Sequence, residues 1–261
     1  MDNKYLKEFY ENYDEDGRLL SRHGRVEFIT TMSYIDRFLF PGAKILEIGA
    51  GTGRYSHTLA RKGYTVDAIE LLEHNIEQFN KNTAEGERIT IRQGNATHLS
   101  FIDDDSYDLT LLLGPMYHLY ENEDKRLALS EAIRVTKKGG VIFAAYCMGD
   151  ASVLQYGFGR GVIKDLIEKC MLDTETFATF SNPWDIFELY RKEDIDELRE
   201  NFDVTQLHFL ATDGYATHIR ERLTEMDEET YELFIKYHLA TCERLDLIGY
   251  SNHTLDIFRK N

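Results

Sequence analysis

Short apolar segments alternate with helical segments between residues 44 and 147, and this alternation restricts the fold more than any other feature of the chain. Strands are predicted at 44–50, 65–71, 89–94, 107–113 and 141–147. Helices are predicted between them at 54–62, 73–82 and 123–137. Apolar strands that alternate with helices are typical of a mostly parallel sheet that is covered on both faces. The expected fold class is therefore α/β, with a doubly wound sheet.

The charge balance limits the partners of this chain. It carries 46 acidic and 30 basic side chains, a formal net charge of −16. Because such a charge repels phosphate backbones, no nucleic-acid partner is expected. No run of about 18 apolar residues exists and the polar start lacks a signal-peptide core, so we expect no membrane partner and a cytoplasmic location. Cys147, Cys170 and Cys242 lie far apart, so neither a disulfide framework nor a metal site is expected.

A glycine-rich turn follows the first strand. Residues 45–55 read ILEIGAGTGRY, an apolar strand that runs through three glycines into a helix. A dinucleotide-binding turn would have its third glycine at the position of Arg54. The lysine that follows the glycines of a P-loop is also absent. Glu47 would repel a pyrophosphate at the strand end and would attract an ammonium group. The turn therefore favours a ligand with an ammonium group and no phosphate.

These residues resemble the first motif of the class I, Rossmann-like, S-adenosylmethionine (SAM) dependent methyltransferases. The resemblance covers residues 42–147 and continues less distinctly to the C-terminus. It implies SAM as the cofactor and a seven-stranded sheet whose last strand is antiparallel, with helical cap insertions. It also implies that Glu70, at the end of the second strand, binds the ribose hydroxyls and that Asn95 contacts the adenine amine. The residues LGPMYHL at 113–119 resemble the loop on which SAM lies in small-molecule members of this family.

The resemblance carries a set of cofactor residues onto this sequence. They are Glu47, Gly49, Ala50, Gly51, Thr52, Gly53, Tyr55, Glu70, Leu71, Asn95, Ala96, Thr97, Leu113 and Gly114. Three of them have simpler readings that stay open. Asn95 is also a common turn residue, Tyr55 also fits helix packing, and Glu70 alone would fit a solvated strand end.

The family topology divides the chain into a core and several caps. We expect an N-terminal helical cap at 1–41, a SAM-binding core at 42–150, a lid insertion at 151–190, and the rest of the sheet at 191–261 with a helical insertion at about 213–252. Asp227 is predicted to cap the main helix of that insertion. Residues 185–232 hold 15 acids and five bases, so most of the negative charge lies in these caps. The acidic stretch fits either a solvated face or attraction of a cationic acceptor.

The expected function is methyl transfer from SAM to an oxygen or nitrogen atom of a small molecule. Its catalytic candidates are His118 and Tyr117 in the loop after the fourth strand, where a histidine with a near-neutral pKa suits proton removal. A structural role for His118 stays open, and His23, Tyr13 and His253 are weaker candidates. The alternatives are a methyltransferase that acts on RNA or protein, a SAM-binding protein without catalysis, and a dehydrogenase. The sequence gives no prediction of the oligomeric state.

Overall fold

A computed structural model describes residues 4–13, 17 and 19–261, and the first predicted cap lies partly outside them. Its sheet contains β1 (Lys44–Ile48), β2 (Thr65–Glu70), β3 (Ile89–Gln93), β4 (Tyr107–Leu112), β5 (Thr136–Met148), β6 (Leu189–Tyr190), β7 (Val204–Ala211) and β8 (His253–Lys260). The strand order is β3-β2-β1-β4-β5-β8-β7, with β6 paired to β5. Strands β1 to β5 run parallel to one another, and β8 is antiparallel to both β5 and β7. The predicted fold class is confirmed.

The sheet has eight strands where the sequence predicts seven. The additional strand, β6, falls in the segment after β5 for which no strand is expected. It pairs in parallel with the end of β5, where Leu189 is opposite Cys147 and Tyr190 is opposite Met148. Because β5 extends past the end of β4, it has a free edge there, and the returning chain forms hydrogen bonds with that edge.

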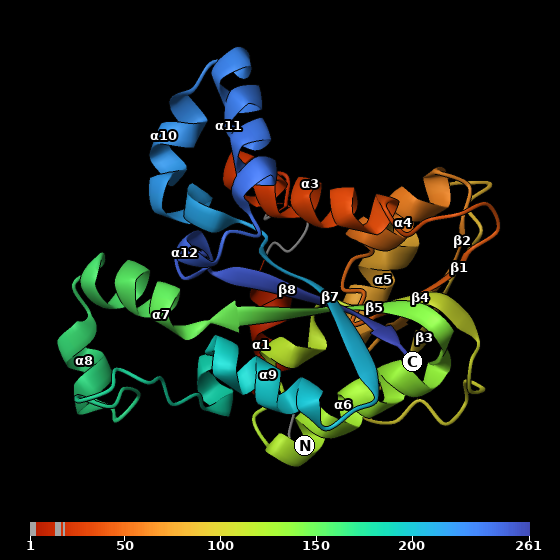
Figure 1. Ribbon diagram of the computed structural model, residues 1–261, viewed down its shortest axis with the longest axis horizontal. Helices are drawn as coiled ribbons and strands as arrows, with labels where there is room; N and C mark the ends of the chain where they lie inside the picture. The colour runs from red at the N-terminus through yellow and green to blue at the C-terminus, as the bar shows by residue number, and fades with distance from the viewer. Residues whose placement is uncertain (1–3, 14–16, 18) are drawn as a thin grey trace.

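Helices cover both faces of the sheet (Figure 1). The core helices are α3 (Arg22–Asp36), α4 (Arg54–Arg61), α5 (Glu73–Asn82), α6 (Asn122–Val135) and α9 (Lys192–Glu200). On one face, Ile35 of α3 and Leu59 of α4 pack with Ile45. On the other face, Leu129 of α6 packs with Leu46. Since neighbouring strand residues point to opposite faces, Ile45 packs in one helix layer and Leu46 in the other. Burial of each such side chain contributes about 1.5–3 kcal/mol to the free energy of folding.

The remaining elements lie at the carboxyl edge of the parallel strands. They are α1 (Lys4–Asn12), η1 (Pro115–Tyr117), α7 (Gly149–Ser152), η2 (Val153–Phe158), α8 (Ile163–Glu168), η3 (Pro183–Asp185), η4 (Gly214–Ile219), α10 (Arg220–Glu225), α11 (Glu228–Thr241) and α12 (Leu245–Ile248). Figure 1 shows α7 and α8 beyond the arrowhead of β5, and α10 and α11, which lie in the connection from β7 to β8, at the top of the view. The predicted cap on α11 is confirmed, because the Asp227 side chain accepts a hydrogen bond of 2.8 Å from the amide of Thr230. Among the described residues, no helix is long and apolar enough to cross a membrane.

Apolar spacing in the sequence predicts one helical stripe from Tyr231 to Leu245, and its last member is wrong. The apolar stripe Tyr231, Phe234, Ile235, His238 and Cys242 would extend to Leu245 if the helix continued. The helix ends at Thr241 instead, and Leu245 opens the separate turn α12 with 77% of its surface exposed. The helical periodicity of α11 therefore does not extend to Leu245.

Candidate functional site

One cavity of about 550 Å³ lies at the carboxyl edge of β1, β2 and β4. All the predicted cofactor residues except Gly53 and Thr97 line it, and so do Tyr117 and His118. Ligands of open α/β sheets bind at the carboxyl ends of the strands, so the cavity lies where a ligand site is expected in this fold. Cap residues from α1, α3, η2 and η4 complete the wall.

The turn between β1 and α4 is built by glycines in the left-handed region. Gly49, Gly51 and Gly53 have φ angles of +75°, +55° and +92°. A Cβ on Gly49 would lie 2.5 Å from the Cδ atom of Pro115, whereas a Cβ on Gly51 would meet no protein atom within 4 Å. The turn therefore packs tightly against the loop after β4 and leaves the side of Gly51 open to a ligand.

Gly53 and Thr97 do not line the cavity, but each lies next in sequence to a residue that does. Gly53 precedes α4, and a Cβ there would lie 2.5 Å from the Phe79 ring and 2.6 Å from Nε2 of His57. The amide of Thr97 donates a 3.0 Å hydrogen bond to Oδ1 of Asn95. This bond is that of an Asx turn, and it leaves the Asn95 oxygen one further lone pair for a ligand donor.

Glu70 joins the glycine turn to the start of α5. Its Oε2 accepts a 2.8 Å hydrogen bond from the amide of Gly51, and its Oε1 accepts bonds of 2.9 Å and 3.2 Å from Leu72 N and Asn75 Nδ2. Burial raises the pKa of Glu70, although these three donors oppose the rise. A carboxylate has about four acceptor sites, so one remains for a hydroxyl group in the cavity. The residue fits the expected ribose contact.

Glu47 presents a second buried carboxyl group to the cavity. The Ser56 hydroxyl donates a hydrogen bond to its Oε2. Burial raises the pKa of Glu47 to about 8, against the opposing effect of Ser56. Among the described residues no cation forms an ion pair with Glu47, so the group lacks the positive partner that would favour its charged form. An ammonium group in the cavity would supply that partner, which matches the amino group of SAM.

His118 is held in place through both ring nitrogens. Its Nδ1 lies 2.7 Å from the carbonyl oxygen of Ile186, and its Nε2 lies 3.0 Å from the hydroxyl of Tyr10 on α1. Since a carbonyl only accepts, the proton is on Nδ1 and Nε2 accepts from Tyr10. Burial lowers the pKa of His118 to about 4, so the ring is neutral near pH 7. These bonds agree with the structural role left open by the sequence.

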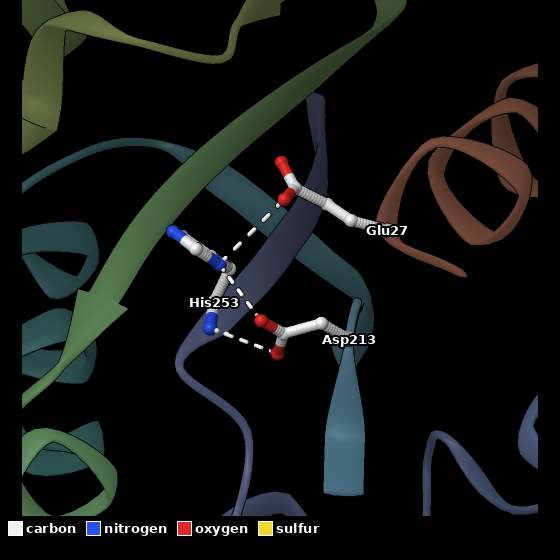
Figure 2. Close-up of side chains that lie close together, drawn as sticks. All are labelled: Glu27, Asp213 and His253. Carbon is white, nitrogen blue, oxygen red and sulfur yellow. Dashed lines mark hydrogen bonds and ion pairs between the residues drawn. The ribbon is translucent and has the colours of Figure 1, made fainter. Parts of the chain in front are cut away.

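Three ionisable residues meet at the other end of the cavity (Figure 2). Glu27 comes from α3, Asp213 follows β7, and His253 begins β8. Nδ1 of His253 lies 2.9 Å from Oδ2 of Asp213 and 3.6 Å from Oε2 of Glu27. The ring centre of His253 is 5.8 Å from that of Tyr117, which places the cluster beside the loop after β4.

Sequence reasoning missed Glu27 and Asp213 and ranked His253 low. The one local signal was an acid at position 213, directly after the segment 204–212, whose sequence predicts a strand. The other weak candidates, Tyr13 and His23, also line the cavity, so the structure brings every catalytic candidate of the sequence to its wall.

Comparison with known proteins agrees with this geometry. Residues 45–140 match the family model described as methyltransferase domain. Over 101 residues the chain is 36% identical to a demethylmenaquinone methyltransferase of Clavibacter sepedonicus, an alignment that covers 39% of this chain and 40% of that protein. It is 32% identical over 107 residues to a ubiquinone biosynthesis O-methyltransferase of Maricaulis maris, with 41% of each chain covered. The chain thus spans about two-fifths of the length of these curated relatives.

A solved structure resembles nearly the whole chain. It is a SAM-dependent methyltransferase of Thermotoga maritima, described as a possible histamine N-methyltransferase, with a TM-score of 0.61, 18% identity and 98% of each chain covered. At this identity the likeness concerns the fold alone. The matched family model, the glycine turn and the two buried carboxyl groups agree on one assignment. Residues 45–140 are a methyltransferase domain, and the chain has the fold of the class I, Rossmann-like, SAM-dependent methyltransferases.

Proposed function

We propose that this protein transfers the methyl group of SAM to an oxygen or nitrogen atom of a small molecule. One observation carries the proposal. A single cavity is lined by Glu47, Glu70 and the glycine turn and also by the Glu27, Asp213 and His253 cluster, and the sheet order β2-β1-β4-β5-β8 separates the strand ends that carry Glu70 and His253. A cofactor pocket that continues into a second, chemically distinct pocket is what a transfer between two bound molecules requires.

Each residue of the cofactor end binds a different part of the cofactor in this proposal. When bound, SAM supplies a methyl group that its sulfonium already activates. Glu70 accepts a hydrogen bond from a ribose hydroxyl, and Glu47 pairs with the amino group. Asn95 offers its amide oxygen to the adenine amine, while Leu71 and Ala96 provide apolar wall. With an activated methyl group, much of the rate comes from positioning the acceptor.

The acceptor side of the cavity is lined by segments from separate parts of the chain. Tyr10 of α1, Tyr156 of η2 and Thr217 of η4 all line it. The cavity volume of about 550 Å³ admits an acceptor of small-molecule size beside the cofactor. The relative named as a ubiquinone biosynthesis O-methyltransferase suggests an oxygen atom as acceptor, and the neighbour described as a possible histamine N-methyltransferase suggests an amine.

His118 and Tyr117 remain proposed participants at this end. His118 can take a proton only at Nε2, and only after the Tyr10 hydroxyl leaves that nitrogen. We therefore assign it first to positioning, because its two bonds connect α1 and the segment around Ile186 over the cavity. Tyr117, beside His253, is proposed to line the acceptor pocket.

The test is methyl transfer from SAM labelled in its methyl group to a cell extract separated by size. We expect label in the small-molecule fraction, and mass spectrometry identifies the product. The E70A variant, whose cofactor end is damaged, is the matched control and should transfer far less label. Label in RNA or protein would favour the macromolecular alternative. SAM binding by calorimetry without any transfer would favour a non-catalytic SAM-binding protein and would end this proposal.

A further inference from the structure

The cluster of Glu27, Asp213 and His253 at the acceptor end contains no residue of the expected cofactor set. Its members come from three distant parts of the chain, and all three line the cavity (Figure 2). We propose that His253 removes the proton of the methyl acceptor through Nε2, and that Asp213 and Glu27 hold the ring for this step. The inference rests on the proposed function and names a site within it.

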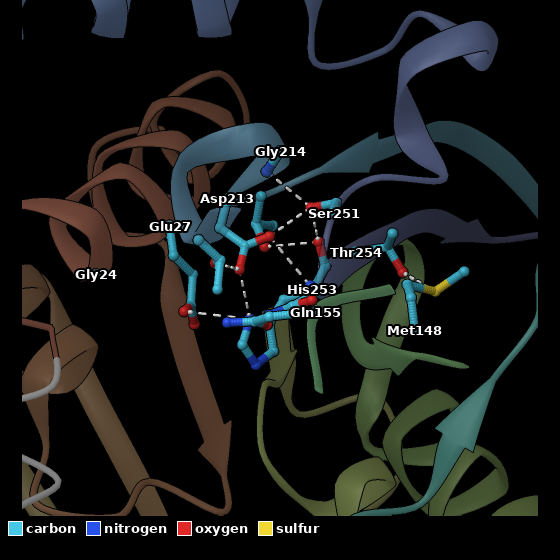
Figure 3. Close-up of polar contacts among 12 residues, drawn as sticks. Gly24, Glu27, Met148, Gln155, Asp213, Gly214, Ser251, His253 and Thr254 are labelled. Atoms are coloured by element: carbon cyan, nitrogen blue, oxygen red, sulfur yellow. Dashed lines mark hydrogen bonds and ion pairs between the residues drawn. The ribbon is translucent and has the colours of Figure 1, made fainter. Parts of the chain in front are cut away.

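The hydrogen bonds of Asp213 fix its carboxylate beside the His253 ring. Its Oδ1 accepts hydrogen bonds of 2.5 Å from the Ser251 hydroxyl and 3.2 Å from the amide of His253. Its Oδ2 accepts from the Thr217 hydroxyl at 3.0 Å and lies 2.9 Å from Nδ1 of His253 (Figure 3). A carboxylate has about four acceptor sites, and four donors occupy them. The remaining capacity for a metal ion is therefore small, and a role in orienting the ring is favoured.

The bond to Asp213 decides which nitrogen of His253 can react. Because the carboxylate accepts, the proton is on Nδ1, and Nε2 has the lone pair when the ring is neutral. Figure 2 shows this second nitrogen on the side of the ring away from both carboxylates. Within the part of the chain that the structure describes, no hydrogen bond to Nε2 is present. The side chain keeps 23% of its surface exposed, and it lines the cavity.

The surroundings of His253, unlike those of His118, stabilise the protonated ring. His253 therefore accepts a proton only in the fraction of the protein whose ring is neutral, and this fraction grows as the pH rises toward the pKa of His253. Glu27 and Asp213 raise the pKa of His253 well above its usual value against the effect of burial, and the Cys147 thiol adds to the rise. Burial lowers the pKa of His118, whose two nitrogens already have partners. The groups that face His253 are thus Glu27 from α3, Asp213 after β7, Cys147 from β5 and the Tyr117 ring.

The step balances with the acceptor as the only proton source. The acceptor's oxygen or nitrogen forms a bond to the methyl carbon, and the carbon–sulfur bond breaks with its electron pair left on sulfur. The acceptor's proton passes to Nε2, giving an imidazolium between two carboxylates. The substrate class is therefore a hydroxyl compound or an amine that must lose a proton, and not a tertiary amine or a thioether.

The first test follows the His253 ring itself by NMR and needs no acceptor. The ring signals of the full chain, saturated with S-adenosylhomocysteine, are recorded against pH, and H253Q assigns the His253 signals. We expect a proton on Nδ1 in the neutral ring and a midpoint above 6.5. E27Q should lower that midpoint by about one pH unit, because it removes one nearby negative charge. A midpoint below 6.5, or no shift in E27Q, would overturn the proposal.

The second test compares variants in the labelled transfer to the small-molecule extract fraction. A general base contributes about 10²- to 10⁴-fold, so H253Q should lose at least 100-fold in rate. Its affinity for S-adenosylhomocysteine, measured by calorimetry, should stay within threefold of the parent, which also shows that it folds. H218Q is the matched control, since His218 lies outside the cavity and bonds the Tyr250 carbonyl.

The outcomes separate this inference from the proposed function. If the parent protein transfers no label, the proposed function fails while the NMR titration still decides the state of His253. If the parent transfers label and H253Q does so equally, the inference fails alone. Activity that a chelator abolishes and Mg²⁺ or Zn²⁺ restores would replace the proton-accepting role with a metal site.

Discussion

The ionisation of Glu47 gives a quantitative prediction about cofactor binding. Burial raises the pKa of this group to about 8, so at pH 6.5 about 0.97 of the free protein has Glu47 protonated. An ammonium group with a pKa of about 8 is charged at the same pH. If that group binds against Glu47, the carboxyl group must release its proton. Binding of SAM at pH 6.5 should therefore release about 0.9 proton from this site.

Calorimetry measures this release directly. The binding enthalpy of SAM is determined at pH 6.5 in several buffers that differ in ionisation enthalpy, and the slope gives the number of protons exchanged. The variant E47Q retains the side-chain volume and an oxygen that can accept from Ser56, but it has no proton to lose. We expect its slope to differ from that of the parent by about 0.9 proton. We also expect the affinity of the parent relative to that of E47Q to rise as the pH is raised from 6.5 to 8, because less of the parent's Glu47 must then lose a proton on binding.

A matching slope in E47Q and the parent would refute the reasoning. It would mean that Glu47 stays protonated in the complex, or that the amino group lies elsewhere. Other titrating groups, including His253, are present in both proteins and cancel in the difference. A lower affinity of E47Q for SAM with unchanged proton release would also contradict the charge pairing. It would indicate that Glu47 contributes only packing contacts to SAM binding.

Three further changes test other parts of the site. E70A should weaken SAM binding at least tenfold by calorimetry, because it removes three hydrogen bonds as well as the ribose acceptor, while E73A on the exposed start of α5 should not. G49A should lower the free energy of unfolding in urea by about 1–3 kcal/mol, since its Cβ would lie 2.5 Å from Pro115 at a φ of +75°; an unchanged midpoint would contradict the close packing. H118L should reduce the dependence of stability on pH. Burial lowers the pKa of His118 to about 4, so the parent should lose up to about 3 kcal/mol as pH falls from 6.5 to 4, and equal slopes in thermal unfolding of both proteins would contradict this.

The sheet and the cofactor end could be predicted from the sequence because their signals are local. The strand, glycines and helix around Gly51 are contiguous, and Glu70 ends the next strand along the chain. The boundaries predicted for β2 and α5 from the sequence pattern agree with the structure to within one residue. The family resemblance then supplies the cofactor, which no spacing rule alone would identify.

The acceptor end depends on contacts that the sequence does not contain locally. Glu27 reaches the cavity because α3 packs on the sheet, and Asp213 meets His253 because β7 and β8 pair in one particular register. His118 looked suited to catalysis by its loop position, yet its two hydrogen bonds depend on Tyr10 and Ile186, which are 108 and 68 residues away. The two-residue strand β6 is too short to give a periodic signal.

The pairing of β7 with β8 has a consequence for how such a protein can diversify. Ala211 is opposite Thr254, and the Thr212 amide donates a hydrogen bond to the His253 carbonyl. Asp213 and His253 therefore stand at the neck of a hairpin, and the whole of η4, α10, α11 and α12 is the loop above that neck. Lengthening, shortening or replacing the far part of that loop leaves the neck register unchanged. The shape of the acceptor pocket can thus evolve separately from the carboxylate and imidazole at its base.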